Sequence, residues 1–121
     1  MATVLLVDDE DISRGYFRVF LERKGGHRVI DAASAEAALT CYQRSPTDVV
    51  VMDLRMPGMN GLEATRALLN YDEQAQVIIL SAEEDTAWAE AAQRAGAKNY
   101  VSKLQAMQRL LPAISELVSK L

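Results

Sequence analysis

Three acidic side chains follow two short apolar runs of this chain. Asp8 and Asp9 come directly after residues 4–7 (VLLV), and Asp53 comes directly after residues 49–52 (VVVM). Runs of this kind are typical of strands buried on both faces of a parallel sheet, so their carboxyl ends should converge on one edge. Three carboxylates gathered there repel one another, and a hard divalent cation relieves that repulsion. We therefore expect a Mg²⁺ site, with Mn²⁺ as the alternative ion.

A loop and two further polar side chains extend this group. Asp53 is followed by LRMPGMNG, whose proline and glycines predict a tight strand-to-helix loop. Ser81 ends the predicted fourth strand, and Lys103 follows the predicted fifth strand. An ionised Asp can attack phosphorus, a divalent cation can neutralise the transferring oxygens, and Lys and Ser can hold the others. The set predicts phosphoryl-transfer chemistry, with Asp53 as the attacking group.

Five short apolar runs alternate with five helical patterns. The predicted strands cover residues 3–7, 28–31, 48–52, 77–80 and 99–101. The alternation predicts an α/β fold with a doubly wound parallel sheet. Helical spacing predicts these buried stripes: Ile12, Tyr16, Val19 and Phe20; Ala35, Ala38, Leu39 and Tyr42; Trp88, Ala91, Ala92 and Ala95; Met107, Leu110, Leu111, Ile114, Leu117, Val118 and Leu121. Glycines at 25, 26 and 96 are predicted to end the first and fourth helices.

Composition limits the classes of protein to consider. The 121 residues are 50% hydrophobic, which predicts one compact domain over residues 1–121 with nothing left for an effector domain. A formal net charge of −4 and no Lys/Arg cluster argue against direct nucleic-acid binding. With Cys41 as the only cysteine, neither an internal disulfide nor a zinc or redox pair is predicted, and we expect a buried inert thiol. No apolar stretch reaches the roughly 18 residues of a membrane span, so we expect a soluble cytoplasmic protein.

The chain resembles the receiver domain of two-component response regulators, a family that includes small chemotaxis regulators, over essentially its whole length. The family's metal-binding acidic pair matches Asp8 and Asp9, and its phosphorylated Asp matches Asp53. Its D-x-x-M-P-x-x-N-G loop is present in full from Asp53 to Gly61. The resemblance implies a flavodoxin-like (βα)₅ fold with five parallel strands in the order 2-1-3-4-5.

The resemblance also implies roles for four other residues. By this resemblance, the backbone carbonyl of Arg55 is a metal ligand and Lys103 is the phosphate-binding lysine. Ser81 corresponds to the Ser/Thr switch residue, and Tyr100 corresponds to the switch aromatic residue. The implied phosphodonor is a sensor histidine kinase or a histidine phosphotransfer protein, and the domain catalyses only its own phosphorylation and dephosphorylation. The implied output surface, formed by the fourth helix, fifth strand and fifth helix, would bind a downstream protein target, act on an effector domain or form a phosphorylation-dependent homodimer.

One position departs from the family pattern. Many receivers carry a proline, often cis, directly after the lysine, whereas this chain has Leu104. A cis bond before a non-proline residue costs about 3 kcal/mol, so we expect a trans bond, and the loop path stays open.

Structural interpretations compete at several of these positions. Asp9 or Asp11 fits a helix N-cap, and residues 81–84 (SAEE) fit a capping box. Lys103 fits a snorkelling surface lysine, Tyr100 an ordinary sheet residue, and His27 a surface residue without a role.

Two functional alternatives remain open. One is an aspartyl-phosphate phosphatase of the haloacid dehalogenase type, which requires a second Asp where this chain has Arg55. The other is a receiver-like interaction module that works without phosphorylation, suggested by the missing proline.

Overall fold

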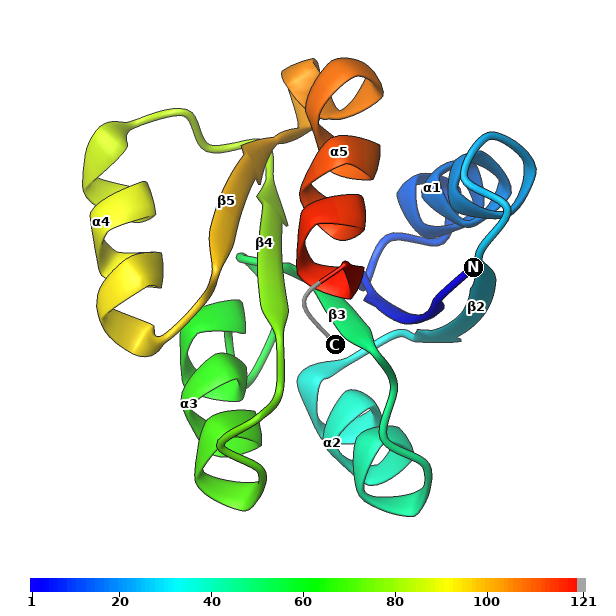
Figure 1. Ribbon diagram of the computed structural model, residues 1–121. Helices are drawn as coiled ribbons and strands as arrows, with labels where there is room; N and C mark the ends of the chain where they lie inside the picture. The colour runs from blue at the N-terminus through cyan, green and yellow to red at the C-terminus, as the bar shows by residue number, and fades with distance from the viewer. Residues whose placement is uncertain (120–121) are drawn as a thin grey trace.

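The computed structural model describes residues 1–119 and contains a five-stranded sheet with five α-helices in that range. The strands are β1 (Thr3–Val7), β2 (Arg28–Ala32), β3 (Val49–Asp53), β4 (Val77–Ser81) and β5 (Asn99–Ser102). The helices are α1 (Asp11–Arg23), α2 (Ala35–Arg44), α3 (Gly61–Tyr71), α4 (Thr86–Ala95) and α5 (Ala106–Val118), with a 3₁₀ turn at Lys103–Gln105 before α5. All five predicted strands are present (Figure 1).

The sheet is parallel throughout, with the strand order β2-β1-β3-β4-β5. This arrangement confirms the predicted flavodoxin-like fold. Every residue of β3 and β4 is buried, as expected for strands covered by helices on both faces. The register pairs Asp53 with Leu80 and Ser81 with Ser102, so the carboxyl ends of β3, β4 and β5 lie at one edge.

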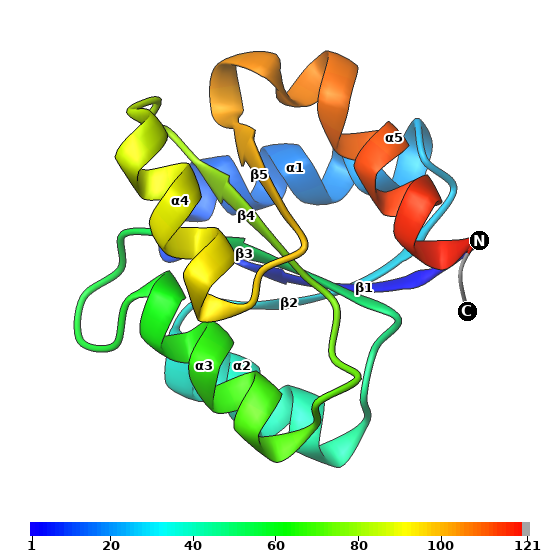
Figure 2. The same ribbon diagram turned by 60° about the vertical axis from the view of Figure 1, so that its left-hand side comes forward.

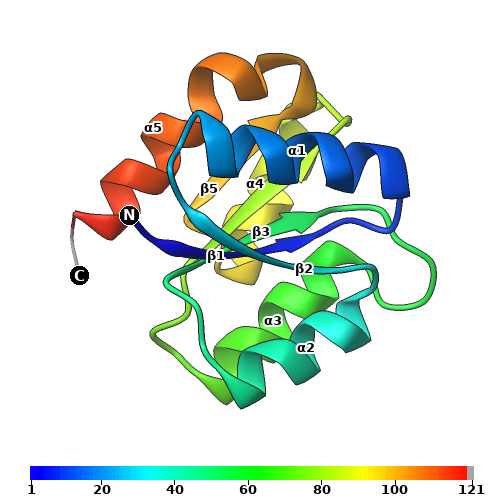
Figure 3. The same cartoon turned by 90° about the vertical axis from the view of Figure 1, so that its right-hand side faces the viewer.

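Helices cover both faces of the sheet. Helices α1 and α5 lie on one face, and α2, α3 and α4 lie on the other (Figures 2 and 3). Neighbouring strand residues alternate between the two cores: Leu5 packs in the core beneath α2, α3 and α4, whereas Leu6 packs in the core beneath α1 and α5. None of the helices within residues 1–119 has the length and apolar character needed to cross a membrane.

The predicted buried stripe of α1 is wrong in three of its four positions. Ile12, Tyr16 and Val19 are 89%, 53% and 50% exposed, and only Phe20 of that stripe is buried. The face on the sheet is formed instead by Phe20 with its neighbours Phe17 and Leu21. Apolar residues occupy two adjacent faces of α1, and spacing alone does not show which of them packs on the sheet.

The other predicted stripes agree better with the structure. In α2 and α4, Ala35, Ala38, Tyr42, Ala92 and Ala95 are buried, and Leu39, Trp88 and Ala91 are partly buried against the same core. In α5, Leu110, Ile114 and Leu117 are buried and Leu111 and Val118 partly buried, but Met107 is 51% exposed. Leu121 lies outside the described residues.

Glycines end α1 and α4 as predicted. Gly96 is the left-handed C-cap of α4 (φ 104°), and Gly26, three residues after the end of α1, also has a positive φ of 66°. Cys41 is partly buried rather than fully buried, and its thiol is free.

Candidate functional site

The three predicted carboxylates meet at the carboxyl edge of the sheet. One carboxylate oxygen from each of Asp8, Asp9 and Asp53 lies within 4.8 Å of the others. Asp8 and Asp53 are only 2% and 8% exposed, and Asp9 is partly exposed. This set consists entirely of hard oxygen donors, which fits Mg²⁺ or Mn²⁺ and does not fit a soft metal.

Asp8 is fixed by hydrogen bonds from the beginning of α1. The Glu10 backbone N–H donates to Asp8 Oδ1 (2.9 Å), and Ser13 Oγ donates to Asp8 Oδ2 (2.6 Å). Arg14 Nη1 donates to the Asp8 carbonyl oxygen (2.9 Å). Ser13 and Arg14 were not predicted from the sequence. Their signal is positional, because the first turn of a helix that follows a strand-end acid lies over that acid.

Lys103 spans the two buried carboxylates. Its Nζ donates to Asp8 Oδ2 (3.1 Å) and to Ser13 Oγ (3.1 Å), and it lies 3.7 Å from Asp53 Oδ2. The Lys103 side chain is 18% exposed, so the snorkelling interpretation is wrong. It lies in the site although Leu104 replaces the expected proline.

The loop after β5 reaches this geometry with a trans Lys103–Leu104 bond, as predicted. Ser102 Oγ accepts a hydrogen bond from the Leu104 backbone N–H (3.2 Å), which fixes the start of the 3₁₀ turn. Leu104 itself is 76% exposed. The turn therefore directs the lysine inward and the leucine outward.

Asp53 has a perturbed acidity. Burial raises the pKa of the Asp53 carboxyl from 3.8 to about 6; the Lys103 ammonium opposes this rise, whereas the charges of Asp8 and Asp9 add to it. The Leu54 backbone N–H donates to Asp53 Oδ1 (2.8 Å), which stabilises the ionised form. Without a cation, the site therefore disfavours the carboxylate that phosphoryl acceptance requires.

The loop after Asp53 is as tight as its sequence predicts. A Cβ on Gly61 would overlap the Asp53 carbonyl oxygen and lie 3.0 Å from Leu54 Cα, so this position requires glycine. Gly58 has a positive φ of 75°. Asn60 begins α3 with a capping box, in which its Oδ1 accepts from the Glu63 N–H (2.9 Å). This loop follows Asp53 directly and begins α3 at a fixed position.

Ser81 and Tyr100 both bind the loop that follows β4. Ser81 is 1% exposed, and its Oγ accepts a hydrogen bond from the Glu83 backbone N–H (3.0 Å). The Tyr100 hydroxyl donates to the Glu83 carbonyl oxygen (2.6 Å), and burial raises the pKa of Tyr100. The two predicted switch residues thus contact the same peptide segment from β4 and from β5.

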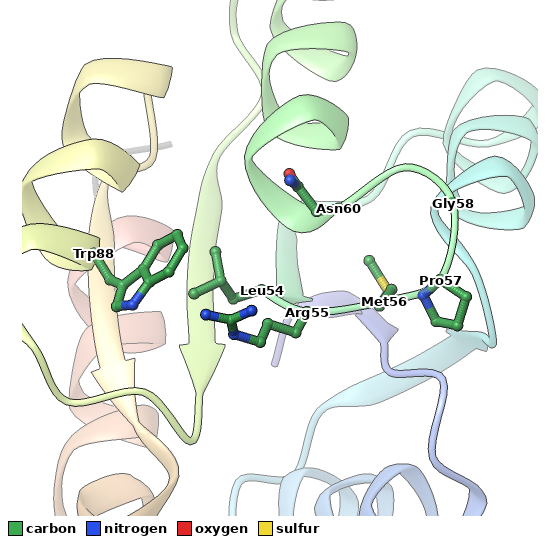
Figure 4. A pocket seen from close by; sticks show the side chains of 7 residues that line it. All are labelled: Leu54, Arg55, Met56, Pro57, Gly58, Asn60 and Trp88. Carbon is green, nitrogen blue, oxygen red and sulfur yellow. The ribbon is translucent and has the colours of Figure 1, made fainter.

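The Arg55 side chain links the β3–α3 loop to the β4–α4 loop. Its Nε donates to Glu83 Oε1 (2.6 Å), and its guanidinium lies 4.8 Å from the centre of the Trp88 ring (Figure 4). Arg55 and Trp88 lie side by side in the wall of a cleft of about 430 Å³, which is also lined by Leu54, Met56, Pro57, Gly58 and Asn60. This bridge was not predictable from the sequence, because Arg55 and Glu83 are far apart in the chain.

Several competing interpretations are wrong. The N-cap residue of α1 is Glu10, without a side-chain cap, so neither Asp9 nor Asp11 has that role. Helix α4 begins at Thr86 with Asp85 as its N-cap, so residues 81–84 form no capping box. His27, expected at the surface, is partly buried, and its Nδ1 accepts a hydrogen bond from the Ala2 N–H (3.1 Å).

Comparison with known proteins gives the same fold and family. The family model "Response regulator receiver domain" matches residues 4–115. Response regulator UvrY of Escherichia coli (strain K12) is 37% identical over 120 residues, which cover 98% of this chain but 55% of UvrY. The chain thus spans about half the length of the first curated relatives it matches, whereas Protein CcdB of Bacillus subtilis (strain 168), 33% identical, is covered over 98% of both chains.

A solved receiver domain shows how closely the folds agree. The crystal structure of a response regulator receiver domain protein from Clostridium thermocellum superposes with a TM-score of 0.90 at 29% identity, covering 99% of this chain and 96% of that one. The strand order, the family model and these relatives agree. The chain belongs to the response regulator receiver domain family of two-component signalling.

Proposed function

We propose that Asp53 accepts a phosphoryl group from a phosphohistidine of a sensor histidine kinase or a histidine phosphotransfer protein. The supporting observation is the cluster of Asp8, Asp9 and Asp53 within 4.8 Å, with Lys103 in contact with two of the three. In the proposed step an Asp53 oxygen attacks phosphorus as the phosphorus–nitrogen bond breaks. The bonding electrons leave with the imidazole, whose other ring nitrogen carries a proton, so the leaving group is a neutral histidine as the Asp53 phosphate forms.

The metal ligands in this proposal are Asp8, Asp9, Asp53 and the backbone carbonyl of Arg55. A bound Mg²⁺ or Mn²⁺ would supply positive charge for the transferring oxygens. Asp53 Oδ1 already accepts the Leu54 N–H, which orients the carboxylate. The Lys103 ammonium, 3.7 Å from Asp53 Oδ2, adds fixed positive charge beside the reacting oxygen.

The proposed switch uses the hydrogen bonds at Glu83. When the Ser81 hydroxyl turns inward to donate to a phosphoryl oxygen, its Oγ can keep accepting the Glu83 N–H, so the β4–α4 loop would be drawn inward with it. Tyr100 shares that peptide segment through the Glu83 carbonyl, so its ring turns with the loop. The change would alter the surface of α4, β5 and α5 for a downstream target, an effector domain or a second copy.

The contacts of Arg55 argue against the phosphatase alternative. That reaction requires a carboxyl group two residues after Asp53, where this chain places a guanidinium bound to Glu83 and stacked on Trp88. A guanidinium stays protonated and is no general base. We therefore propose a phosphoacceptor that modifies only itself, with residues 1–121 acting as one receiver domain in the cytoplasm.

The test is phosphorylation by a small donor. Wild type, Asp53→Asn and the exposed-acid control Asp85→Asn are incubated with acetyl phosphate, with and without Mg²⁺, and their intact masses are measured. We expect one Mg²⁺-dependent phosphoryl adduct on wild type and on Asp85→Asn, and none on Asp53→Asn. An adduct that persists in Asp53→Asn would contradict the assignment, and no adduct on any chain would favour the interaction module.

A further inference from the structure

The Ser13 hydroxyl, in the first turn of α1, is bound from both sides by charged groups of the site. Its Oγ donates to Asp8 Oδ2 (2.6 Å) and accepts from Lys103 Nζ (3.1 Å). The direction of each bond follows from the chemistry of the partner, because an ammonium can only donate and a carboxylate can only accept. Ser13 therefore joins the lysine to one of the two buried carboxylates, and its hydroxyl cannot turn away without losing a charged partner.

The Lys103 ammonium is hydrogen-bonded to Asp8 and Ser13 but not to Asp53. Nζ lies 3.1 Å from both Asp8 Oδ2 and Ser13 Oγ, whereas it lies 3.7 Å from Asp53 Oδ2. The last distance is that of an ion pair and is too long for a hydrogen bond. The lysine thus places positive charge beside the proposed phosphoacceptor without bonding to its Oδ2.

The backbone around Lys103 does not fix the position of the ammonium. A flexible aliphatic stem separates Nζ from the main chain. The next residue, Leu104, is 76% exposed, so the packing of its side chain does not anchor the turn. The acceptors around Nζ must therefore determine where it lies. Ser13 is the neutral acceptor among them, and it draws Nζ toward α1 against the attraction of the Asp53 charge.

We propose that Ser13 is a positioning residue for Lys103, which keeps the ammonium out of hydrogen-bond distance of Asp53 until phosphoryl transfer begins. This inference rests on the proposed phosphoacceptor function of Asp53. The Asp53 carboxylate loses negative charge as it attacks phosphorus, so a hydrogen bond from Lys103 would be stronger before the reaction than in the transition state and would slow it. An ammonium held nearby can instead stabilise the negative charge of the incoming phosphoryl oxygens.

NMR of the metal-free, unphosphorylated chain tests the position of the lysine. Scalar couplings across hydrogen bonds are measured between Lys103 ¹⁵Nζ and the carboxyl carbons. Wild type and Ser13→Thr, which keeps the hydroxyl, are expected to show coupling to Asp8 Cγ alone. Ser13→Val has the shape of the Thr variant without the hydroxyl, so a further coupling to Asp53 Cγ should appear, as it should in the smaller variant Ser13→Ala. If neither variant shows coupling to Asp53, the proposal is overturned.

The rate of phosphorylation tests the consequence of this positioning. Phosphoryl uptake from acetyl phosphate with Mg²⁺ is followed by intact mass. Ser13→Val is expected to be about tenfold slower than wild type, because a small displacement at a reacting group has a large effect on rate. Ser13→Thr should match wild type. Thr40→Val is the control for loss of a helix hydroxyl, since Thr40 is exposed on α2 and bonds only the Glu36 carbonyl oxygen (3.2 Å).

A double variant separates this role from a purely structural one at Asp8. If Ser13 acts through the lysine, Ser13→Val should cause no further slowing in a chain that already carries Lys103→Met. Equal slowing in both backgrounds would mean that Ser13 acts by orienting Asp8, which would overturn the proposal. A wild type that takes up no phosphoryl group would contradict the proposed function instead, and the couplings, measured without donor or metal, would still decide whether Ser13 positions the lysine.

Discussion

Replacing Asp53 by Asn should stabilise the metal-free protein above pH 6. Asn keeps the shape of the side chain, and its Oδ1 can still accept the Leu54 N–H, so the main change is the loss of a buried charge. The pKa of Asp53 is about 6 in the folded chain and 3.8 ordinarily. Because folding raises this pKa, the folded state binds the proton more tightly, and wild-type stability falls as pH rises from about 4 to about 6.

The size of the effect follows from the same two pKa values. Their difference of about two, at about 1.4 kcal/mol for each pKa unit, gives a ceiling of ~3 kcal/mol. Residual solvent contact screens this energy, and we expect about 1–2 kcal/mol in favour of Asp53→Asn at pH 8. At pH 4 the difference should be close to zero, since the wild-type carboxyl is then mostly protonated in the folded state.

Urea denaturation from pH 4 to pH 8, with a chelator present, measures this difference in unfolding free energy. Urea is used because it is uncharged and does not screen electrostatic interactions. Glu90→Gln, which removes an exposed charge on α4, is the control and should show no comparable pH dependence. Added Mg²⁺ should stabilise wild type and not Asp53→Asn. A wild type as stable as Asp53→Asn at pH 8 without metal would refute the claim that the buried Asp53 charge destabilises the metal-free fold.

Three other changes test parts of the structure around the site. Gly61→Ala should cost about 1–3 kcal/mol of unfolding free energy, measured in urea, because its Cβ would overlap the Asp53 carbonyl. An unchanged midpoint would contradict this packing. Lys103→Met should raise the pKa of Asp53 further, since the Lys103 charge lowers it, and a carboxyl NMR titration that shows no rise would place the lysine elsewhere. Tyr42→Phe should cost about 1 kcal/mol through loss of the 2.7 Å hydrogen bond to Asp72, and equal thermal stability would show that this bond contributes little.

The sequence predicts the carboxyl edge of the sheet well because its signals are local. An apolar run that ends in acid identifies a strand, its direction and the position of the acid in a parallel sheet. Asp8 and Asp53 lie together for this reason, although 45 residues separate them in the chain. The same reasoning predicts the position of Lys103, because this residue comes directly after the end of β5.

Features that depend on helix rotation and on loop contacts were not predictable in this way. Helix α1 has apolar side chains on two adjacent faces, and its rotation is fixed by the packing of Phe17, Phe20 and Leu21 against the sheet. The bridge from Arg55 to Glu83 joins two loops and has no periodic signal. Such contacts are set by tertiary packing, so the structure is needed to find them.

The most direct test of the central claim is to locate the phosphoryl group. The chain is phosphorylated with acetyl phosphate and Mg²⁺ and reduced with borohydride, which converts an aspartyl phosphate to homoserine, and the product is mapped by peptide fragmentation. The expected product has homoserine at position 53 and at no other position. Homoserine at position 8 or 9, or a borohydride-resistant phosphate at Ser81, would contradict it.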